Sequence, residues 1–235
     1  MTDSKICIAL DFQTKTEVQQ FLLKFNNEKL YVKVGMELFY GEGIEIIKTI
    51  KAMGHKIFLD LKLHDIPNTV RSAMRQLAKL GVDMVNVHAS GSVAMMKAAI
   101  AGLEEGKIGD KRPLCIAVTC LTSLDQKVLD KELLIYESLP TVVLQLAKNA
   151  KEAGLDGIVC SPWESELIHQ HLGTDFITVT PGIRLTEASN DDQKRVATPS
   201  RARELTSTYI VVGRPITGAE DPYAIYQKIH KEFQG

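Results

Sequence analysis

The sequence predicts a single α/β domain, residues 1–235, folded as a closed (β/α)8 TIM barrel. Three features support this fold. Short runs rich in β-branched residues recur eight times, and segments of helical periodicity separate them. The length of 235 residues is close to the roughly 250 that such a barrel typically needs. In addition, no linker, low-complexity tract or repeat divides the chain.

Each predicted strand is a short apolar run that contains β-branched or aromatic residues. In order, the runs are KICIALD (5–11), LYVKVGM (30–36), KIFLDLK (56–62), DMVNVHA (83–89), LCIAVT (114–119), GIVCS (157–161), FITVTP (176–181) and YIVVGR (209–214). The predicted helices between them carry apolar residues at i, i+3 and i+4. They cover residues 16–25, 43–53, 69–81, 92–105, 141–154 and 221–233.

Two longer segments interrupt this alternation. Residues 122–139 are predicted to be an insertion after the fifth strand, and 184–198 a long polar loop after the seventh. Loops at this end of a barrel build the active site. A doubly wound open sheet is the main alternative fold, but it usually has a glycine-rich turn after its first strand. The segment ALDFQTKTE contains no glycine, so the barrel is favoured.

The charge balance argues against several classes of partner. The chain has 28 basic and 29 acidic residues and a net charge of −1, so it offers no basic field for nucleic acid or an anionic membrane. No apolar stretch approaches the ~18 residues of a membrane span, and no signal peptide is evident. The four cysteines form no CxxC pair, which indicates buried thiols rather than zinc ligands or disulfides. We therefore expect a cytoplasmic protein.

Charged residues stand on the inward face of the third predicted strand. Alternate residues from Ile57 to Leu63 are all apolar and suit packing against helices. The opposite face carries Phe58, Asp60 and Lys62, and therefore points into the barrel. Two opposite charges at a barrel mouth are costly unless they are paired. An internal salt bridge that only closes the barrel is the structural alternative.

Neighbouring strands repeat this pattern, which favours a functional site over a lone salt bridge. Asp11 in the first strand and Lys33 in the second also fall on the inward face. Asp65 follows three residues after Lys62, where the strand has become a loop. Converging acids and bases imply coupled ionisation and a site suited to electrostatic catalysis.

The last two strands end in segments that suit phosphate binding. Arg184 closes PGIR after the seventh strand, and Gly213 and Arg214 lie in VVGRPIT after the eighth. Barrels often bind phosphate here through loop N–H groups and a short helix, and arginine presents a fork to phosphate oxygens. The histidines form no ligand set with Asp or Glu, so no metal is expected.

These segments closely resemble the orotidine 5′-phosphate decarboxylase family in its bacterial form. The resemblance runs through the whole chain, in the order IALDF, YVKVGMELFY, FLDLKLHDIPNTV, LGVDMVNVHA, AVTCLTS, TVTPGIR and VVGRPIT. The run DLKLHDIPNT contains DxKxxDI and is highly specific, whereas DxKxxD alone also occurs in related sugar-phosphate barrels. The implied activity is a cofactor-independent carboxy-lyase that converts orotidine 5′-phosphate to UMP in de novo pyrimidine synthesis.

The resemblance also implies roles for individual residues. Lys62 would donate the proton to C6 of the pyrimidine, Asp60 would lie beside the substrate carboxylate, and Lys33 would join the charge network and contact the ribose. Asp11 would bind a ribose hydroxyl. The remaining implied contacts are Thr122 at the pyrimidine edge, Gln193 on a closing lid, and Arg184, Gly213 and Arg214 at the phosphate.

The resemblance further implies a homodimer with shared sites. Asp65, with Ile66 and Thr69, would complete the site of the neighbouring subunit. One rival is 3-hexulose-6-phosphate synthase or a related lyase, which uses Mg²⁺ and an enediolate; IPNT, LDF and GMELFY argue against it. A catalytically inactive barrel that serves as a scaffold is a second rival, and retention of both the charged row and the phosphate segments argues against that.

Overall fold

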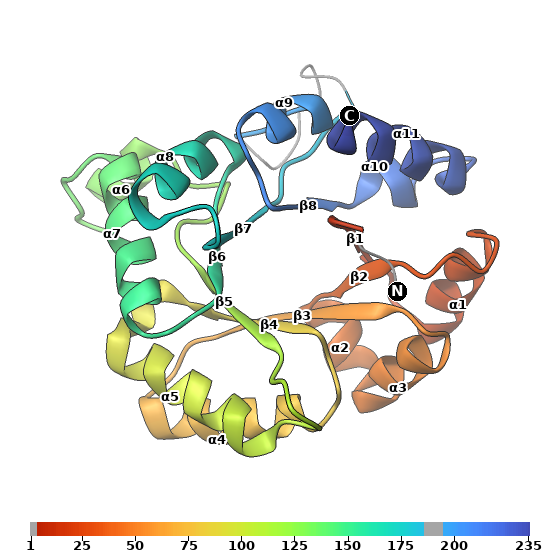
Figure 1. Cartoon of the computed structure of the whole chain (residues 1–235), viewed down its shortest axis with the longest axis horizontal. Helices are drawn as coiled ribbons and strands as arrows, with labels where there is room; N and C mark the ends of the chain where they lie inside the picture. The colour runs from red at the N-terminus through yellow and green to blue at the C-terminus, as the bar shows by residue number, and fades with distance from the viewer. Residues whose placement is uncertain (1–3, 186–194) are drawn as a thin grey trace.

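The computed structural model describes residues 4–185 and 195–235. In this part of the chain eight parallel strands form one closed barrel in the order β1 to β8. Figure 1 shows the strands as a ring at the centre of the molecule, with the helices around it. The predicted (β/α)8 barrel of a single domain is confirmed.

The element boundaries follow the predicted alternation. The strands are β1 (Ile6–Ala9), β2 (Tyr31–Val34), β3 (Lys56–Leu63), β4 (Met84–His88), β5 (Leu114–Val118), β6 (Gly157–Val159), β7 (Ile177–Thr180) and β8 (Tyr209–Val212). The helices are α1 (Lys15–Leu23), α2 (Met36–Glu42), α3 (Ile44–Ala52), α4 (Pro67–Ala78), α5 (Ser92–Gly106), α6 (Gln126–Lys131), α7 (Leu139–Glu152), α8 (Pro162–Leu172), α9 (Pro199–Glu204), α10 (Arg214–Thr217) and α11 (Pro222–Gln234), together with the 3₁₀ helix η1 (Ala89–Gly91).

Helices α2, α6, α8 and α9 lie outside the predicted helical segments. The second predicted strand was extended too far, because β2 ends at Val34 and α2 begins at Met36 after the extended Gly35. The insertion after β5 contains α6, whose first turn is capped by the side chain of Asp125. Helix α8 begins with a capping box. The side chain of Ser161 accepts a hydrogen bond from the backbone N–H of Glu164, and the side chain of Glu164 accepts one from the backbone N–H of Ser161.

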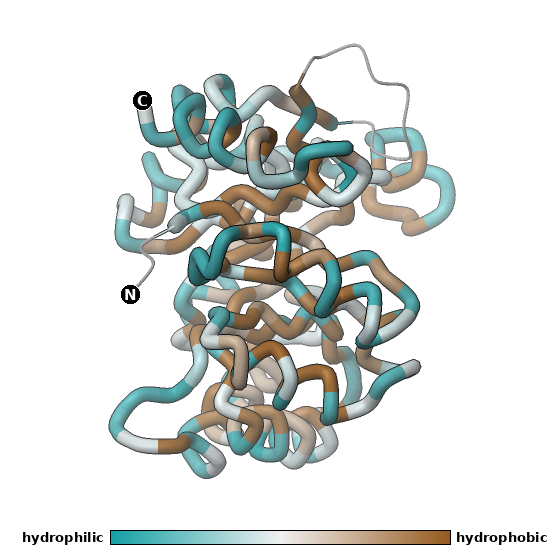
Figure 2. Tube along the Cα trace, turned by 90° about the vertical axis from the view of Figure 1, so that its right-hand side faces the viewer, coloured by the Kyte–Doolittle hydropathy of each residue, from teal (hydrophilic) through white to brown (hydrophobic). Residues whose placement is uncertain are grey.

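The apolar residues form two layers, one inside the ring of strands and one between the strands and the helices. The inner layer consists of Cys7, Ala9, Tyr31, Phe58, Met84, Ile116, Val179 and Val211. The outer layer is larger and includes the alternate residues Ile57, Leu59 and Leu61 of β3. Hydrophobic segments accordingly follow the strands through the middle of the molecule in Figure 2. The predicted inward and outward faces of β3 are therefore confirmed.

The cysteines are free thiols in these apolar layers. All four are buried, and burial raises the pKa of Cys115 and Cys160 to about 12. The prediction of buried thiols is confirmed. Across the described ranges no helix has both the length and the apolar character needed to cross a bilayer.

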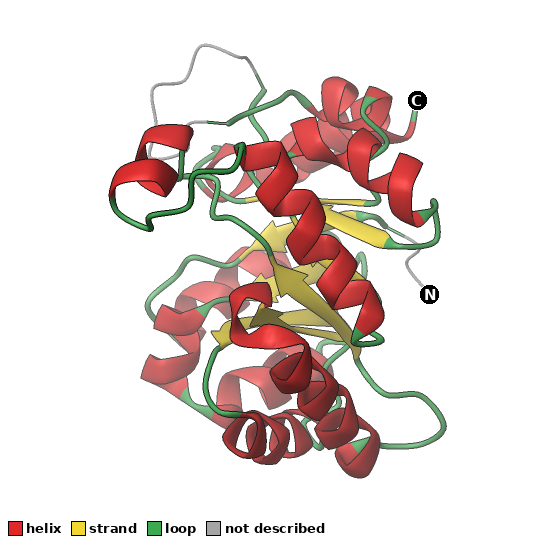
Figure 3. Ribbon diagram, turned by 90° about the vertical axis from the view of Figure 1, so that its left-hand side faces the viewer, coloured by secondary structure: helices red, strands yellow, loops and turns green. Residues whose placement is uncertain are grey.

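Helices α4 and α5 pack more closely than any other pair in the outer layer, and they lie side by side in Figure 1. Figure 3 shows the helical layer from the side, with the strands inside it. The close approach depends on two glycines of α5, one turn apart. A Cβ at Gly102 would overlap the carbonyl oxygen of Arg71, and one at Gly106 would overlap that of Arg75. The backbones of the two helices are therefore in direct contact here.

The barrel is closed by its first and last strands. Strand β1 pairs with β8 in parallel, with Cys7 opposite Val211. Near this seam the hydroxyl of Tyr226 in α11 donates a 3.0 Å hydrogen bond to Ser4 Oγ. The residues that follow β1 and β8 therefore meet at the same edge of the barrel.

Candidate active site

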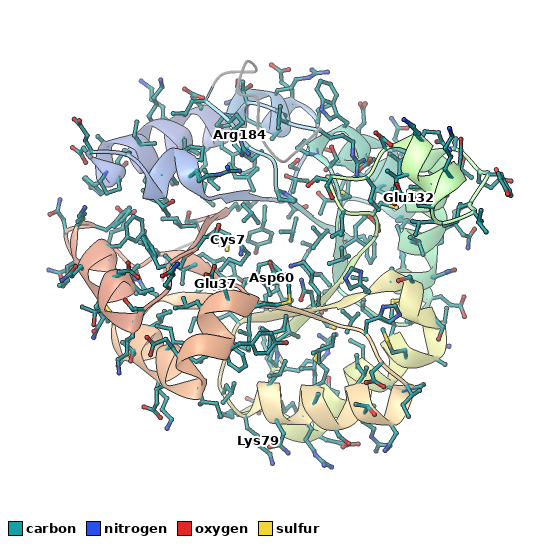
Figure 4. All side chains as sticks on the ribbon, turned by 180° about the vertical axis from the view of Figure 1, so that it is seen from behind. Cys7, Glu37, Asp60, Lys79, Glu132 and Arg184 are labelled. Atoms are coloured by element: carbon teal, nitrogen blue, oxygen red, sulfur yellow. The ribbon has the colours of Figure 1, made fainter. Side chains whose placement is uncertain are left out.

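A cavity of about 610 Å³ opens at the carboxyl ends of the strands. Its polar or charged side chains come from most of the barrel: Asp11, Lys33, Asp60, Lys62, Asn86, Thr122, Ser123, Arg184 and Arg214. Its floor is the inner apolar layer, with Ala9, Phe58, Val179 and Val211. In Figure 4 the labelled Cys7 and Asp60 lie toward the middle of the ring, whereas Lys79 and Glu132 lie at its outer edge.

Four charged side chains form a continuous network on one wall of this cavity. Lys62 Nζ lies 2.7 Å from Asp60 Oδ1, and Lys33 Nζ lies 3.5 Å from Asp60 Oδ2. Lys33 also reaches Asp11, with 3.4 Å between Nζ and Oδ1. The order along the wall is therefore Asp11, Lys33, Asp60, Lys62, with alternating sign. The converging charges that the strand faces predicted are brought together in one place.

The network keeps its buried members charged. Burial by itself would raise the pKa of Asp60, but Lys33 and Lys62, together with hydrogen bonds from Lys62 and Asn86, hold that pKa below its usual value. Burial likewise disfavours the charged form of Lys33, yet Asp60 and Asp11 outweigh it and raise the Lys33 pKa. Asp60 is thus a carboxylate, and Lys33 an ammonium, throughout the neutral range.

The backbone changes direction where Lys62 leaves β3. Lys62 has φ +52°, in the left-handed region that a non-glycine residue rarely adopts. The β3–β4 register shifts here, since Leu59 is opposite Val85 and Leu63 is opposite Val87. An advance of four residues along β3 is therefore matched by an advance of only two along β4. Lys62 lies in the resulting bulge. Bulges beside active sites commonly redirect a side chain.

The phosphate-binding candidates follow β7 and β8, and the end of β8 adjoins Asp11 across the barrel seam. Arg184 is almost fully buried, and its Nη1 donates a 2.9 Å hydrogen bond to the carbonyl of Ile183. Arg214 begins the short helix α10 and lines the cavity. A Cβ at Gly213 would come within 3.3 Å of Asp11 Oδ2, so the absence of a side chain keeps this corner open. Thr122 also lines the cavity, in the loop after β5.

Three of the predicted site residues lie outside this cavity. Asp65, Ile66 and Thr69 are exposed, and none is among the described residues that line the cavity of the same chain. Asp65 Oδ1 accepts a 2.6 Å hydrogen bond from the backbone N–H of Ile66, the N-cap of α4. Ile66 itself is 67% exposed, which is unusual for a large apolar side chain. Gln193 lies outside the described residues.

The sequence patterns did not single out three polar residues at or near the cavity, namely Asn86, Ser123 and Arg195. Asn86 is buried in the middle of β4 and bonds to the charged network; its signal was a lone amide in an otherwise apolar strand. Arg195 pairs with the buried Glu164 of α8 and donates a 3.2 Å hydrogen bond to the carbonyl of Leu121, beside Thr122. Among residues 4–185 and 195–235, no three His, Cys, Asp or Glu side chains form a group that could hold a metal ion.

Known proteins resemble this chain over almost its full length. A protein of Bacillus cytotoxicus named orotidine 5′-phosphate decarboxylase is 59% identical over 231 residues, which are 98% of this chain and 97% of the relative. The protein of the same name from Bacillus mycoides matches to the same extent.

Solved structures agree with the sequence relatives. The crystal structure of orotidine 5′-phosphate decarboxylase from Lactobacillus acidophilus superimposes with a TM-score of 0.88 at 45% identity, covering 98% of this chain and 99% of that one. An uncharacterized conserved protein from Geobacillus kaustophilus also gives a TM-score of 0.88, at 48% identity, with coverage of 97% and 99%. Residues 4–229 match the family described as "Orotidine 5'-phosphate decarboxylase / HUMPS family". The chain therefore belongs to the orotidine 5′-phosphate decarboxylase / HUMPS family.

Proposed function

We propose that this chain decarboxylates orotidine 5′-phosphate to UMP and CO2, as the last step of de novo pyrimidine nucleotide synthesis in the cytoplasm. The observation that carries the proposal is the Lys33–Asp60–Lys62 network on the wall of a cavity that also contains Arg184 and Arg214. The relatives that carry the decarboxylase name share 58–59% of their residues with the chain, which supports the same assignment.

The reaction explains why fixed charges are needed. Loss of CO2 from C6 leaves an electron pair in the plane of the pyrimidine ring, where the ring π system cannot delocalise it. Many decarboxylases recruit an electron sink such as PLP for this purpose. Without one, the protein must stabilise the carbanion with charges that are oriented in advance and shielded from water.

Lys62 supplies both the cation and the proton. As the bond between C6 and the carboxylate carbon breaks, the electron pair stays on C6 and CO2 departs. The Lys62 ammonium, held by Asp60 Oδ1, then gives its proton to C6 and completes the UMP ring. Asp60 lies beside the substrate carboxylate, where its negative charge disfavours the bound carboxylate relative to neutral CO2.

The remaining cavity residues bind the parts of the substrate that do not react. We assign Lys33 and Asp11 to the ribose, Thr122 to the pyrimidine edge, and Arg184 and Arg214 with Gly213 to the phosphate; all of these residues line the cavity. Gln193 contributes to the phosphate and the base from the long loop. Binding energy from the phosphate can then be spent on orienting the pyrimidine against the charged wall.

A metal-free assay tests the reaction directly. Purified protein treated with EDTA should deplete the absorbance of orotidine 5′-phosphate and form UMP, since each proposed step uses only the protein's own charges. A heat-denatured sample is the blank, and untreated protein is the matched control. Absence of turnover by both preparations would refute the decarboxylase assignment. Activity that EDTA removes and Mg²⁺ restores would favour the sugar-phosphate lyase instead.

We further propose that the enzyme acts as a homodimer in which Asp65, Ile66 and Thr69 complete the partner's site. These residues follow the catalytic strand directly, yet they are exposed and lie outside the cavity of their own chain. An exposed isoleucine beside an exposed carboxylate suits an interface with a second copy, where both would be covered.

Mixing two inactive variants tests this arrangement. Lys62→Ala removes the proton donor from its own cavity, and Asp65→Ala removes the residue given to the partner. After the two are mixed, unfolded and refolded together, half of the dimers should be mixed, and each should contain one intact site. Activity should therefore recover to about a quarter of the wild-type value per subunit.

The alternative gives a different result. If Asp65 served the cavity of its own chain, every cavity in the mixed dimers would lack either Lys62 or Asp65. Activity would then stay at the level of the separate variants. Each variant refolded alone is the control for the refolding step.

A further inference from the structure

Asn86 occupies an unusual position for a side-chain amide. It lies in the middle of β4, is 1% exposed, and lines the cavity one layer above the apolar Met84. Burying an amide is favourable only where its donor and its acceptor both find partners. Both partners of Asn86 belong to the pair that carries out the proposed chemistry.

Asn86 makes one hydrogen bond to Asp60 and one to Lys62. Asn86 Nδ2 donates to Asp60 Oδ1 at 2.7 Å, the same oxygen that accepts from Lys62 Nζ. Asn86 Oδ1 accepts from the backbone N–H of Lys62 at 2.8 Å. The assignment of oxygen and nitrogen in the amide is fixed by these partners, since a carboxylate only accepts and a backbone N–H only donates.

The second bond lies where the backbone is strained. Lys62 has φ +52°, and the β3–β4 ladder is out of register between Leu59 and Leu63. A left-handed lysine persists only where surrounding contacts hold it. The Asn86 carbonyl accepts the backbone N–H at that residue, and so stabilises the conformation that directs the lysine side chain to Asp60.

We propose that Asn86 is a positioning residue for decarboxylation, which fixes the carboxylate of Asp60 and the left-handed backbone of Lys62 with one amide. The inference rests on the proposed function, because it concerns the same site. Without Asn86, Lys62 relaxes toward an extended backbone and its ammonium moves away from C6. An error of about 1 Å in such a group costs on the order of 100-fold in rate.

Two variants separate positioning from general stability. Asn86→Leu keeps the volume and removes both hydrogen bonds, so kcat for orotidine 5′-phosphate should fall about 100-fold while the Kd for UMP changes by less than about threefold. Thr178→Val is the matched control, because Thr178 is fully buried and hydrogen-bonded to Thr208 on the barrel but does not line the cavity. Thr178→Val should lose about as much stability as Asn86→Leu, but it should keep the kcat of the wild type.

Asn86→Asp gives a pH signature that a purely structural role would not produce. At pH 8 the new carboxylate faces Asp60 Oδ1 and repels it. As the pH falls, one proton binds to the pair of carboxyls, and the protonated group can donate to its neighbour as Asn86 Nδ2 does. The kcat of this variant relative to wild type should therefore rise by about tenfold between pH 8 and pH 5.5.

The outcomes are distinct. The inference is overturned if Asn86→Leu keeps kcat within about threefold of wild type, or if the relative kcat of Asn86→Asp is flat with pH. Should Asn86→Leu fail to fold, the Asn86→Asp profile still decides. If wild type itself has no decarboxylase activity, the proposed function fails; a crystal structure of an Asn86 variant then tests positioning alone, which requires that Lys62 lose its positive φ.

Discussion

Lys62→Ala should lower kcat for orotidine 5′-phosphate by about 10⁴-fold or more, the largest effect expected of a single side chain here. In the proposed mechanism the lysine is both the cation nearest the developing carbanion and the source of its proton, and these contributions multiply. Its Nζ is held 2.7 Å from Asp60 Oδ1, so the charge is oriented before the substrate arrives. The variant removes the whole group, and no neighbouring side chain can replace it in the same position.

Binding and catalysis should separate in this variant. The affinity for UMP, measured by calorimetry, should stay close to that of wild type, because Arg184 and Arg214, the proposed phosphate-binding residues of the cavity, are unchanged. Lys48→Ala is the matched control: Lys48 is exposed on α3, paired with Glu45 at 2.6 Å, and far from any proposed role. A Lys62→Ala enzyme that kept more than a tenth of wild-type kcat would show that Lys62 is not the proton donor.

Gly102→Ala should destabilise the fold by about 1–3 kcal/mol, and lower Tm by roughly 2–12 °C. In an unobstructed helix the same change would stabilise, because glycine is the poorer helix former. At Gly102 the new Cβ would overlap the carbonyl of Arg71, so α5 and α4 must move apart. The sign of the effect is thus set by contact between two backbones. Thermal unfolding of the purified variant measures it.

Gly41→Ala provides the matched control. Gly41 lies inside α2 without a positive φ, and a Cβ there would meet only Gln13 O, at an ordinary distance of 3.8 Å. This variant should be neutral or more stable by up to about 1 kcal/mol. Equal changes in Tm for the two variants would rule out the backbone contact as the cause. The activity of Gly102→Ala should also fall. A shift of α4 would move Thr69, which lies in its first turn and is proposed to contribute to the partner's site.

The barrel could be predicted because its signals are local. Alternation along β3 assigned Asp60 to the inside of the barrel and Leu59 to the outside. Which of the two environments a side chain enters, the cavity or the layer under the helices, depends only on the face of the strand that it occupies. The helices α2, α6 and α9 were missed because they have only six or seven residues and hence little periodicity. Helix α8 did carry a readable start, the Ser161–Glu164 capping box, so that omission was avoidable.

The site was predictable in its residue types but not in its backbone. Alternation places Lys62 inside, but it does not reveal the left-handed φ or the register shift, which depend on how β3 meets β4. Asn86 was missed for the same reason, because its meaning comes from its two partners on another strand. The role proposed for Asp65 involves a second chain, and periodicity within one chain carries no information about such a contact.

The seam between β1 and β8 has a consequence for how the molecule is made. Strand β1 is the first of the barrel to be synthesised and β8 is the last, yet they are neighbours. While the ribosome extends the chain, β1 therefore keeps an unpaired edge, the kind of surface that nascent chains must have protected from aggregation. Asp11 and Gly213 also come together only at this seam. A translating chain thus has no complete cavity, and the part of the site that a single chain supplies assembles in one late step as the ring closes.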